Sequence, residues 1–399
     1  MYLPVVAASP YGWGRRSTQR VRPGAECDVN HIDGRVSPGS CRMAPLGTLI
    51  YGSNGYTGRL IVARAMERGL RPILAGRNAQ EVRQLAEAHG LEHRAFPLDD
   101  SRRVDEGLDG IGVVVHCAGP FSRTSRPMAD ACLRGGAHYL DITGEIAVFE
   151  ALAARDAEAK AHGVMLLPGV GFDVVPSDCL AAHLARRLPT ATRLALGFQA
   201  IGGMSRGTAT TMIESGGRGG VVRRRGALVP VPVAWKTRRI DFGTGPRLAT
   251  TIPWGDVATA FHSTGIGDVE VYVAVPAKTR RVMIASRYAS WLLRTAPVRA
   301  VLLRAVRRRP AGPSVAARAR GVSRLWGEAS DDSGRRAVSR LTGPEGYTLT
   351  ALTAVAAVEK VHAGGARAGF QTPSLAFGAD FVMEIGGVTR EDLAESGEP

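Results

Sequence analysis

The sequence predicts an α/β protein with a doubly wound parallel sheet, followed by a second α/β domain. Three observations support this class: apolar strand-like runs alternate with helical periods between residues 48 and 167, a three-glycine turn follows the first run, and mixed strand and helix patterns continue from residue 190. The chain has 399 residues and 45% hydrophobic content, enough for about two domains. It contains no long uncharged apolar run of the kind that spans a membrane.

The first predicted strand runs into three glycines spaced G-x-x-G-x-x-G and then into an amphipathic helix. Gly52 permits a tight turn, Gly55 lets the backbone approach a pyrophosphate, and Gly58 lets the helix pack close to the sheet. The helix N-terminus then faces the negative charge of the phosphates. This pattern is typical of a Rossmann-type dinucleotide site.

The second predicted strand, residues 72–75, lies where a Rossmann domain binds the cofactor ribose. Enzymes that select NAD place an acid there, about 20 residues past the glycines, whereas an arginine accommodates a 2′-phosphate. No acid occurs between Glu67 and Glu81, and Arg77 follows the strand. The sequence therefore predicts NADP(H) as the cofactor.

Four further strands are predicted at residues 94–98, 112–117, 138–141 and 164–167, with helices over 126–135 and 147–162. Six such strands fit the order 3-2-1-4-5-6, in which ligands bind at the carboxyl ends of the strands. The residues expected at those ends are Gly52, Arg77, Asp99, Gly119 and Asp141.

Six motifs in order extend the prediction: GSNGYTGR, LAGRN, CAGPFSRTSRPMADACLRGGAHYLDITGE, LLPGVGFDVVPSD, GGMSRGT and GPEGYTLTA. Together they resemble the saccharopine dehydrogenase-like oxidoreductases, including the bacterial trans-acting enoyl reductase branch, over residues 46 to 380. The resemblance implies an N-terminal Rossmann NADP-binding domain, a C-terminal α/β domain, and a substrate bound between them. The cofactor residues that it implies are Gly52, Ser53, Asn54, Gly55, Tyr56, Thr57, Gly58, Arg77, Asn78, Asp99, Gly119, Pro120 and Phe121.

The sequence departs from the family pattern in two places. Ser53 and Asn54 stand where Ala-Thr is usual, and the second-domain motif has Arg206 after Ser205 where glycine is usual. Ser205 and Arg206 are the expected substrate residues, and the guanidinium of Arg206 either favours an anionic substrate or fills space that a larger substrate needs.

Hydride transfer also requires a group that stabilises or protonates the developing charge. Polar residues at strand ends and in glycine-flanked loops are the candidates: His116, Tyr139, Asp141, Glu145, Asp173, Ser177 and Asp178. We select Asp173 as the catalytic acid, with Tyr139 as a second catalytic candidate. Structural roles are the alternatives, a hydrogen-bonded core tyrosine for Tyr139 and helix capping for Ser177 and Asp178. No metal site is expected, because the cysteines form no C-x-x-C pair.

The net charge of +15 is uneven, with +12 between residues 280 and 340. Residues 280–309 are expected to be helical with a break at Pro297, and they mix apolar residues with arginines. We favour a core-facing helix with a solvated arginine face. A peripheral contact with anionic membrane is the alternative, and nucleic acid is not expected.

The predicted organisation is a disordered or non-native extension at 1–42, a Rossmann domain at 43–175, a substrate domain at 176–380 and a tail at 381–399. We expect a cytoplasmic protein, membrane-associated if the basic segment docks on lipid, and a homodimer is compatible with the sequence. The expected function is an NADP(H)-dependent oxidoreductase that reduces a C=C or C=N bond of a small or lipid-linked substrate. A non-catalytic NADP(H)-binding protein is the alternative.

Overall fold

The computed structural model describes residues 31–32, 35–36, 47–199, 203–215, 219–289 and 295–394. The chain divides into two units, residues 1–46 and 47–399. In the first unit, β1 (His31–Ile32) pairs antiparallel with β2 (Arg35–Val36). The prediction of a disordered or non-native extension concerns residues 1–42, and apart from these four residues that segment lies outside the described part of the chain. All remaining elements belong to the second unit.

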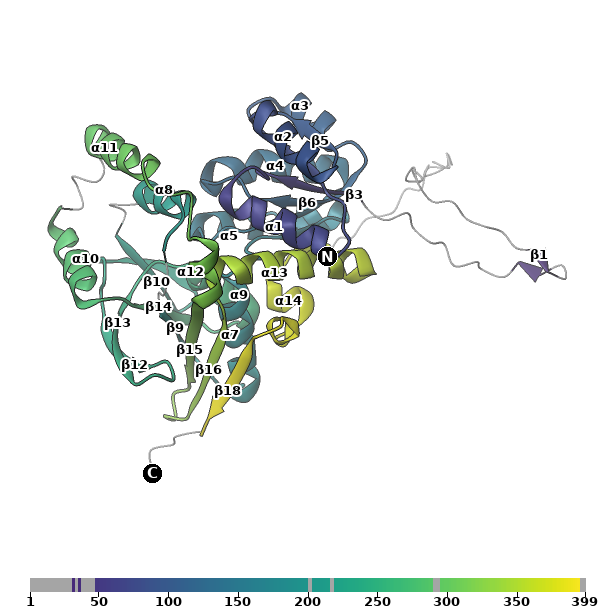
Figure 1. Cartoon of the computed structure of the whole chain (residues 1–399). Helices are drawn as coiled ribbons and strands as arrows, with labels where there is room; N and C mark the ends of the chain where they lie inside the picture. The colour runs from purple at the N-terminus through teal and green to yellow at the C-terminus, as the bar shows by residue number, and fades with distance from the viewer. Residues whose placement is uncertain are drawn as a thin grey trace, which may run out of the picture. The chain divides into compact units, whose positions relative to one another are not determined.

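A parallel sheet of seven strands carries the glycine turn (Figure 1), and its order is β17-β8-β7-β6-β3-β4-β5. The strands are β3 (Gly47–Tyr51), β4 (Ile73–Gly76), β5 (His93–Ala95), β6 (Ile111–His116), β7 (His138–Asp141), β8 (Met165–Leu167) and β17 (Gly369–Phe370). The first six follow the predicted 3-2-1-4-5-6 order, which confirms the Rossmann-type class. The seventh strand, β17, was not predicted and pairs parallel with β8.

Helices cross between these strands and bury their apolar sides against the sheet. They are α1 (Tyr56–Glu67), α2 (Ala79–His89), α3 (Ser101–Gly107), α4 (Phe121–Gly135), α5 (Ile146–Ala153) and α6 (Asp156–Ala161). Three predicted boundaries were wrong. β5 ends before Pro97, which has no amide to donate to a ladder; α4 begins at Phe121 rather than Arg126; and the helix predicted over 147–162 is divided between α5 and α6.

The second sheet is mixed, with the order β11-β10-β14-β9-β15-β16-β18 and with β13 joining β12 to β14. Its strands are β9 (Arg193–Gln199), β10 (Gly220–Arg224), β11 (Ala227–Val231), β12 (Thr237–Asp241), β13 (Pro246–Thr251), β14 (Asp268–Ala274), β15 (Val322–Ser330), β16 (Arg336–Pro344) and β18 (Thr389–Leu393). A second α/β region is therefore confirmed. Residues 220–224 form β10, in which buried Arg223 pairs with Glu150.

The helices of this second region are α7 (Val175–Arg187), α8 (Arg206–Ser215), α9 (Asp256–Thr264), α10 (Ala277–Ala289), α11 (Ala296–Arg307), α12 (Val315–Arg320), α13 (Gly346–Lys360) and α14 (Pro373–Phe377). A π-helical turn, Val361–Gly365, and a 3₁₀ turn, Phe381–Glu384, follow. α13 packs along α1, so the last long helix supports the glycine-motif helix. No helix in the described part of the chain is both long and apolar enough to cross a membrane.

Candidate cofactor and substrate site

The glycine turn between β3 and α1 has the conformation that a phosphate-binding loop needs. Gly52 has a φ of 80°, and a Cβ there would lie 2.9 Å from the backbone nitrogen of Ala118, so a side chain is excluded. At Gly58 a Cβ would lie 2.3 Å from the carbonyl oxygen of Gly52, so only glycine lets the helix start this close to the turn. Both positions therefore require glycine for the reasons that the motif predicts.

The N-terminus of α1 suits an anion. Gly55 is the N-cap and provides no side-chain cap, and the first turn contains no acid. By contrast, Asn78 and Asp100 cap α2 and α3 with their side chains. The first amides of a helix have no partners within the helix. The chain's own residues therefore fit the pyrophosphate of a dinucleotide at this point.

Two of the expected loop residues have structural contacts instead. Ser53 is buried, and its hydroxyl donates to the carbonyl oxygen of Ala75 at 3.2 Å. The phenol of Tyr56 donates to the carbonyl oxygen of Pro313 at 2.7 Å and accepts from Arg318 at 2.9 Å. Tyr56 thus ties α1 to the segment before α12.

The ends of β3, β4 and β5 bring together the residues expected to bind ribose. Burial raises the pKa of Tyr51 to about 12, and the nearby charges of Arg77 and Asp99 lower and raise it respectively. Arg77 and Asp99 are both exposed at this edge. Arg77 therefore lies where a 2′-phosphate is bound in NADP-dependent Rossmann domains.

Glu81 connects this edge to the glycine turn. Its carboxylate accepts from the side-chain amides of Asn54 and Asn78, both at 2.7 Å. Asn78 also accepts from the Glu81 backbone at 3.3 Å, which caps α2. Asn54 and Asn78, both expected to be cofactor residues, are thus held by one acid.

The turn Gly119–Phe121 follows β6 and begins α4, and its Gly119–Pro120 peptide bond is cis. The Glu145 carboxylate accepts from the backbone amides of Phe121 at 2.8 Å and Ser122 at 3.1 Å. Glu145 was one of the wider candidates, although its partners lie more than twenty residues away in sequence. It fixes the turn that we expected beside the nicotinamide.

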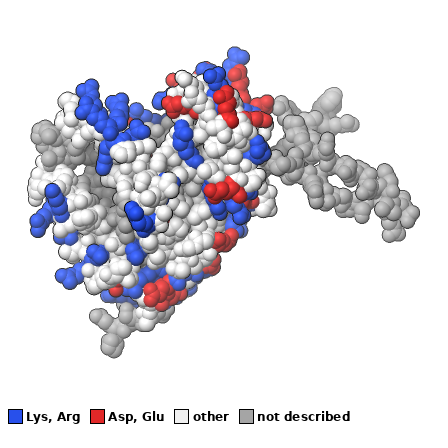
Figure 2. All heavy atoms as spheres, viewed as in Figure 1, with Lys and Arg blue, Asp and Glu red and all other residues white. Residues whose placement is uncertain are grey.

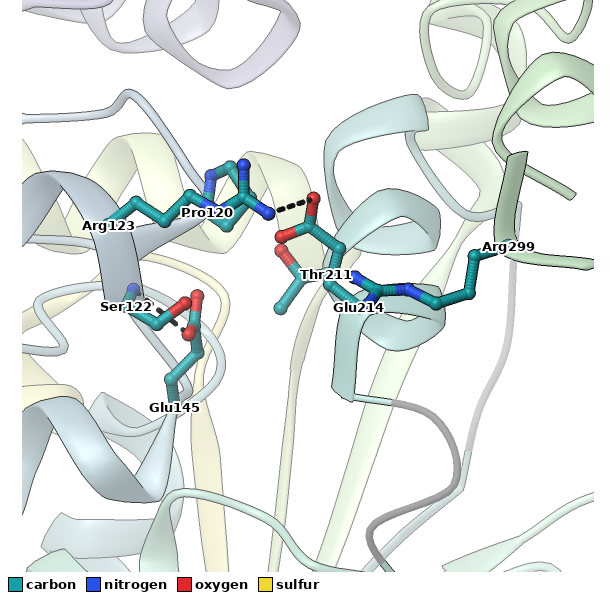
Figure 3. Close-up of a pocket in the computed structure, with 7 residues that line it drawn as sticks. All are labelled: Pro120, Ser122, Arg123, Glu145, Thr211, Glu214 and Arg299. Atoms are coloured by element: carbon teal, nitrogen blue, oxygen red, sulfur yellow. Dashed lines mark hydrogen bonds and ion pairs between the residues drawn. The ribbon is translucent and has the colours of Figure 1, made fainter. Parts of the chain in front are cut away.

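A pocket of about 60 Å³ opens beside this turn (Figure 3). Arg123 of α4 forms an ion pair with Glu214 of α8 at 3.5 Å, and Arg299 of α11 extends toward the same point. One wall of the pocket thus comes from α4 and the Glu145 loop, and the other comes from α8 and α11. Both walls carry charged side chains. Its lining residues are Pro120, Ser122, Arg123, Glu145, Thr211, Glu214 and Arg299.

The sequence did not identify Arg123, Thr211, Glu214 or Arg299 as site residues. Arg123 lies within the motif that follows β6, two residues past the Gly-Pro-Phe turn, and that position was the available signal. Thr211 and Glu214 lie on α8 beyond the GGMSRGT motif, and Arg299 lies on α11, which carries no motif; only the fold brings α8 and α11 to α4.

Tyr139 and Asp141 lie together in the core at the end of β7. The phenol of Tyr139, fully buried, donates to Asp141 at 2.6 Å, and Asp141 also accepts from the amides of Thr143 and Gly169, each at 2.9 Å. Burial raises the pKa of Asp141 to about 6, partly opposed by these hydrogen bonds. This arrangement joins the ends of β7 and β8, and it gives Tyr139 a structural role.

His116 is also buried, and its Nε2 lies 2.9 Å from the hydroxyl of Thr124. Burial lowers the pKa of His116 to about 3. The imidazole is therefore neutral near pH 7 and packs against Tyr51, Phe121 and Tyr139 as a core aromatic.

Asp173 lies behind the Glu145 loop. A Cβ added at Gly144 would lie 3.0 Å from its Oδ2, so the Asp173 carboxyl packs against the residue next to Glu145. Burial raises its pKa to about 6. Asp173 is thus a carboxyl with a near-neutral pKa, one residue removed from a pocket wall.

The expected substrate residues lie at the start of α8. Ser205 is buried, and its hydroxyl accepts from the backbone amide of Thr208 at 3.2 Å. The backbone amide of Ser205 donates to the phenol oxygen of Tyr347 at 2.7 Å. Arg206 is exposed, and its amide donates to the carbonyl oxygen of Ala311 at 3.0 Å. Among the described residues no hydrogen bond or ion pair joins Arg206 to Asp173.

Residues 48–167 match the family model of the saccharopine dehydrogenase NADP binding domain. This match covers most of the predicted cofactor domain, and it confirms the predicted resemblance and NADP(H) as the cofactor class.

Curated relatives carry enoyl reductase names. A trans-acting enoyl reductase of Mycobacterium leprae is 32% identical over 148 residues, 35% of each chain, so this match spans about a third of the relative. A candidate trans-acting enoyl reductase of Mycobacterium tuberculosis is 26% identical over 365 residues, covering 76% of this chain and 85% of the relative. The comparison groups the chain with oxidoreductases.

Solved structures agree on the fold. Saccharopine dehydrogenase (L-Glu forming) from Saccharomyces cerevisiae superposes with a TM-score of 0.58 at 11% identity, covering 88% of this chain and all of that one. Homospermidine synthase from Legionella pneumophila gives 0.57 at 11% identity, covering 87% and 91%. The similarity includes the second region, so the two-sheet architecture is shared.

Proposed function

We propose that this chain is an NADPH-dependent oxidoreductase that reduces a C=C or C=N bond of a small or lipid-linked substrate. The observation that carries the proposal is the pocket beside the Gly119–Phe121 turn, because its walls come from the cofactor-binding sheet and from α8 and α11. We propose residues 43–175 as the cofactor domain and 176–380 as the substrate domain. The enoyl reductase names of the relatives favour the C=C bond.

The residues that would hold the cofactor lie on three strand ends. The uncapped first turn of α1 would bind the pyrophosphate, and Arg77 with Asn78 would bind the 2′-phosphate. When bound, NADPH supplies a hydride. The fixed turn at Phe121 then has the role of orienting the reacting groups, and Glu145 maintains that turn through two hydrogen bonds.

Addition of a hydride to a C=C or C=N bond leaves an electron pair that must accept a proton. A general acid works best when its pKa lies near the working pH. Asp173, with a pKa of about 6, keeps a useful protonated fraction at neutral pH. In this proposal Asp173 gives the proton to the substrate, and a proton from water later replaces it.

Two arginines and two glutamates line the pocket, and the arginine donors suggest the substrate class. Arg123 is paired with Glu214, whereas Arg299 reaches the pocket from another helix. Arg206 is exposed at the start of α8, the helix that contributes Thr211 and Glu214 to the pocket. A carbonyl-bearing or anionic substrate fits these donors, and a purely apolar one does not.

The test is an NADPH fluorescence titration followed by NADPH-consumption assays on panels of enoyl thioesters and cyclic imines. We expect saturable NADPH binding and turnover with at least one panel. The variant Asp173→Asn tests the proposed proton donor and should lower turnover. Asp109→Asn, at an exposed position, is its matched control and should leave turnover unchanged. Binding without consumption on either panel would favour the non-catalytic NADP(H)-binding alternative.

A further inference from the structure

Residues 271–327 contain 13 lysines and arginines and no aspartate or glutamate. This acid-free segment includes α10 and α11, so no carboxylate within it neutralises the positive charge. In Figure 2 basic side chains gather over the α11 end of the molecule. Elsewhere in the described chain arginines on helices are often paired within the helix, as Arg102 is with Glu106.

Apolar side chains on the same two helices are exposed. Val282 is 63% exposed, Tyr288 84% and Val301 67%, and of the described residues of α10 and α11 only Val306 is buried. The two helices therefore bury only part of their apolar surface. A helix normally buries its apolar side, so these side chains indicate a missing apolar partner.

The two sides of α11 have different surroundings. Arg299 lines the pocket and Val306, two turns further on, is buried, so this side faces the protein. The opposite side carries Val301, Arg304 and Arg308, all exposed. A shallow apolar recess of Pro297, Val298, Val301 and Leu302 continues that outer side.

The exposed side of α10 has a similar composition. Lys278, Arg281, Val282 and Tyr288 are all exposed on it. Basic residues mixed with apolar ones and an exposed tyrosine are the composition of helices that lie at a membrane surface. Tyrosine is favoured there because its ring is apolar and its hydroxyl is hydrated.

We propose that the outer faces of α10 and α11 dock this protein on an anionic lipid bilayer. Anionic headgroups complement the arginines of this acid-free segment, and the headgroup boundary takes up Val282, Tyr288 and Val301. Nucleic acid would match the charge but would leave these apolar side chains in water. Because α11 also lines the pocket, docking brings the pocket beside the bilayer; that last step rests on the proposed function, whereas the docking itself does not.

The experiment is sedimentation of the full chain with phosphatidylcholine vesicles, with and without phosphatidylglycerol. We expect binding only to the anionic vesicles, falling between about 0.1 M and about 1 M salt as the screening length drops from about 10 Å to about 3 Å. No binding at low salt, or equal binding to neutral vesicles, would overturn the proposal. Binding to a DNA duplex without binding to vesicles would overturn it in favour of nucleic acid.

Variants separate the contribution of the arginines to vesicle binding from that of the apolar side chains. The triple variant Arg304→Gln, Arg307→Gln and Arg308→Gln should weaken vesicle binding at least about tenfold. The matched control is the triple variant Arg83→Gln, Arg102→Gln and Arg126→Gln, which removes the same charge from exposed positions on other helices. It should change vesicle binding little. Val301→Ser with Tyr288→Ser should remove the part of the binding that resists salt.

Circular dichroism and NADPH titration must be unchanged in every variant, which separates loss of docking from loss of fold. An equal loss of vesicle binding in the control triple would also contradict the proposal, because the effect would then follow net charge alone.

Discussion

Glu145 caps the helix that begins at Phe121, its carboxylate accepting from the Phe121 amide at 2.8 Å. An acid from the loop after β7 therefore holds the first turn of the helix after β6. The charge is also favourable, because a helix N-terminus carries partial positive charge. This contact fixes the turn on which the pocket is built.

Glu145→Ala should lower the free energy of unfolding by about 1–2 kcal/mol, since two helix-start amides lose their acceptor. Glu145→Gln keeps one acceptor oxygen and should cost about half as much. Denaturant unfolding measures both. If the alanine variant unfolds like the wild type, the capping bonds do not contribute to stability.

Arg77→Ala should remove most of the preference for NADPH over NADH. Loss of a charge-assisted contact to the 2′-phosphate should cost about 1.5–3 kcal/mol, or about tenfold or more in affinity. Fluorescence titration with each cofactor measures the ratio, and Arg83→Ala on the exposed side of α2 is the control. Equal affinities of the wild type for the two cofactors would disprove the role of Arg77.

The order of the six strands was predictable because each strand is a short apolar run followed by a helix. β17 was not, because its two residues, Gly369–Phe370, lie some two hundred residues beyond β8 and carry no strand pattern of their own. Tertiary contacts hold this strand in place. One of them is a hydrogen bond that the Phe370 amide donates to the Asp156 carboxylate at 3.0 Å. A sequence pattern does not encode such a partner.

The cofactor edge was predictable for a similar local reason, whereas the opposite wall of the pocket was not. Gly52, Arg77 and the Gly119–Phe121 turn each follow a strand, so their meeting follows from the strand order. Arg299 and Glu214 reach the pocket only because α8 packs on α11. Likewise, the exposure of α10 and α11 depends on what the rest of the chain leaves uncovered.

Stability should depend on pH through Asp141. Its pKa is raised from 3.8 to about 6 in the folded state, so its contribution is complete below about pH 4 and is lost as the pH rises through about 6. A shift of about two units corresponds to up to about 3 kcal/mol. Asp141→Asn stays neutral, and should flatten this part of the unfolding free energy measured between pH 4 and 7.

Asp173 contributes to the same pH range, so the slope should not vanish in Asp141→Asn alone. The exposed substitution Asp109→Asn should leave the profile unchanged. A profile for Asp141→Asn that matches the wild type at every pH would mean that the buried carboxyl is not protonated on folding.

Arg206→Gly should raise the Michaelis constant and widen the range of substrate sizes, while turnover changes little. The exposed guanidinium is expected to contact substrate in the bound state, so its removal takes away a binding contact and its bulk together. Steady-state kinetics on a chain-length series of enoyl thioesters is the measurement. An unchanged Michaelis constant across that series would exclude Arg206 from the substrate site.

Asp173→Asn should lower turnover at least about tenfold and leave NADPH affinity nearly unchanged, a loss of at least about 1.4 kcal/mol confined to the transition state. The reason is that Asp173 packs against Gly144, the neighbour of the pocket residue Glu145, and has a pKa of about 6. As the acid, Asp173 must be protonated, so wild-type turnover should fall as the pH rises above about 6, and this dependence should disappear in the asparagine variant. A structural role alone would lower stability without moving the pH profile of turnover. If the variant keeps the wild-type profile at reduced stability, Asp173 is a turn residue, and the proton comes from another group.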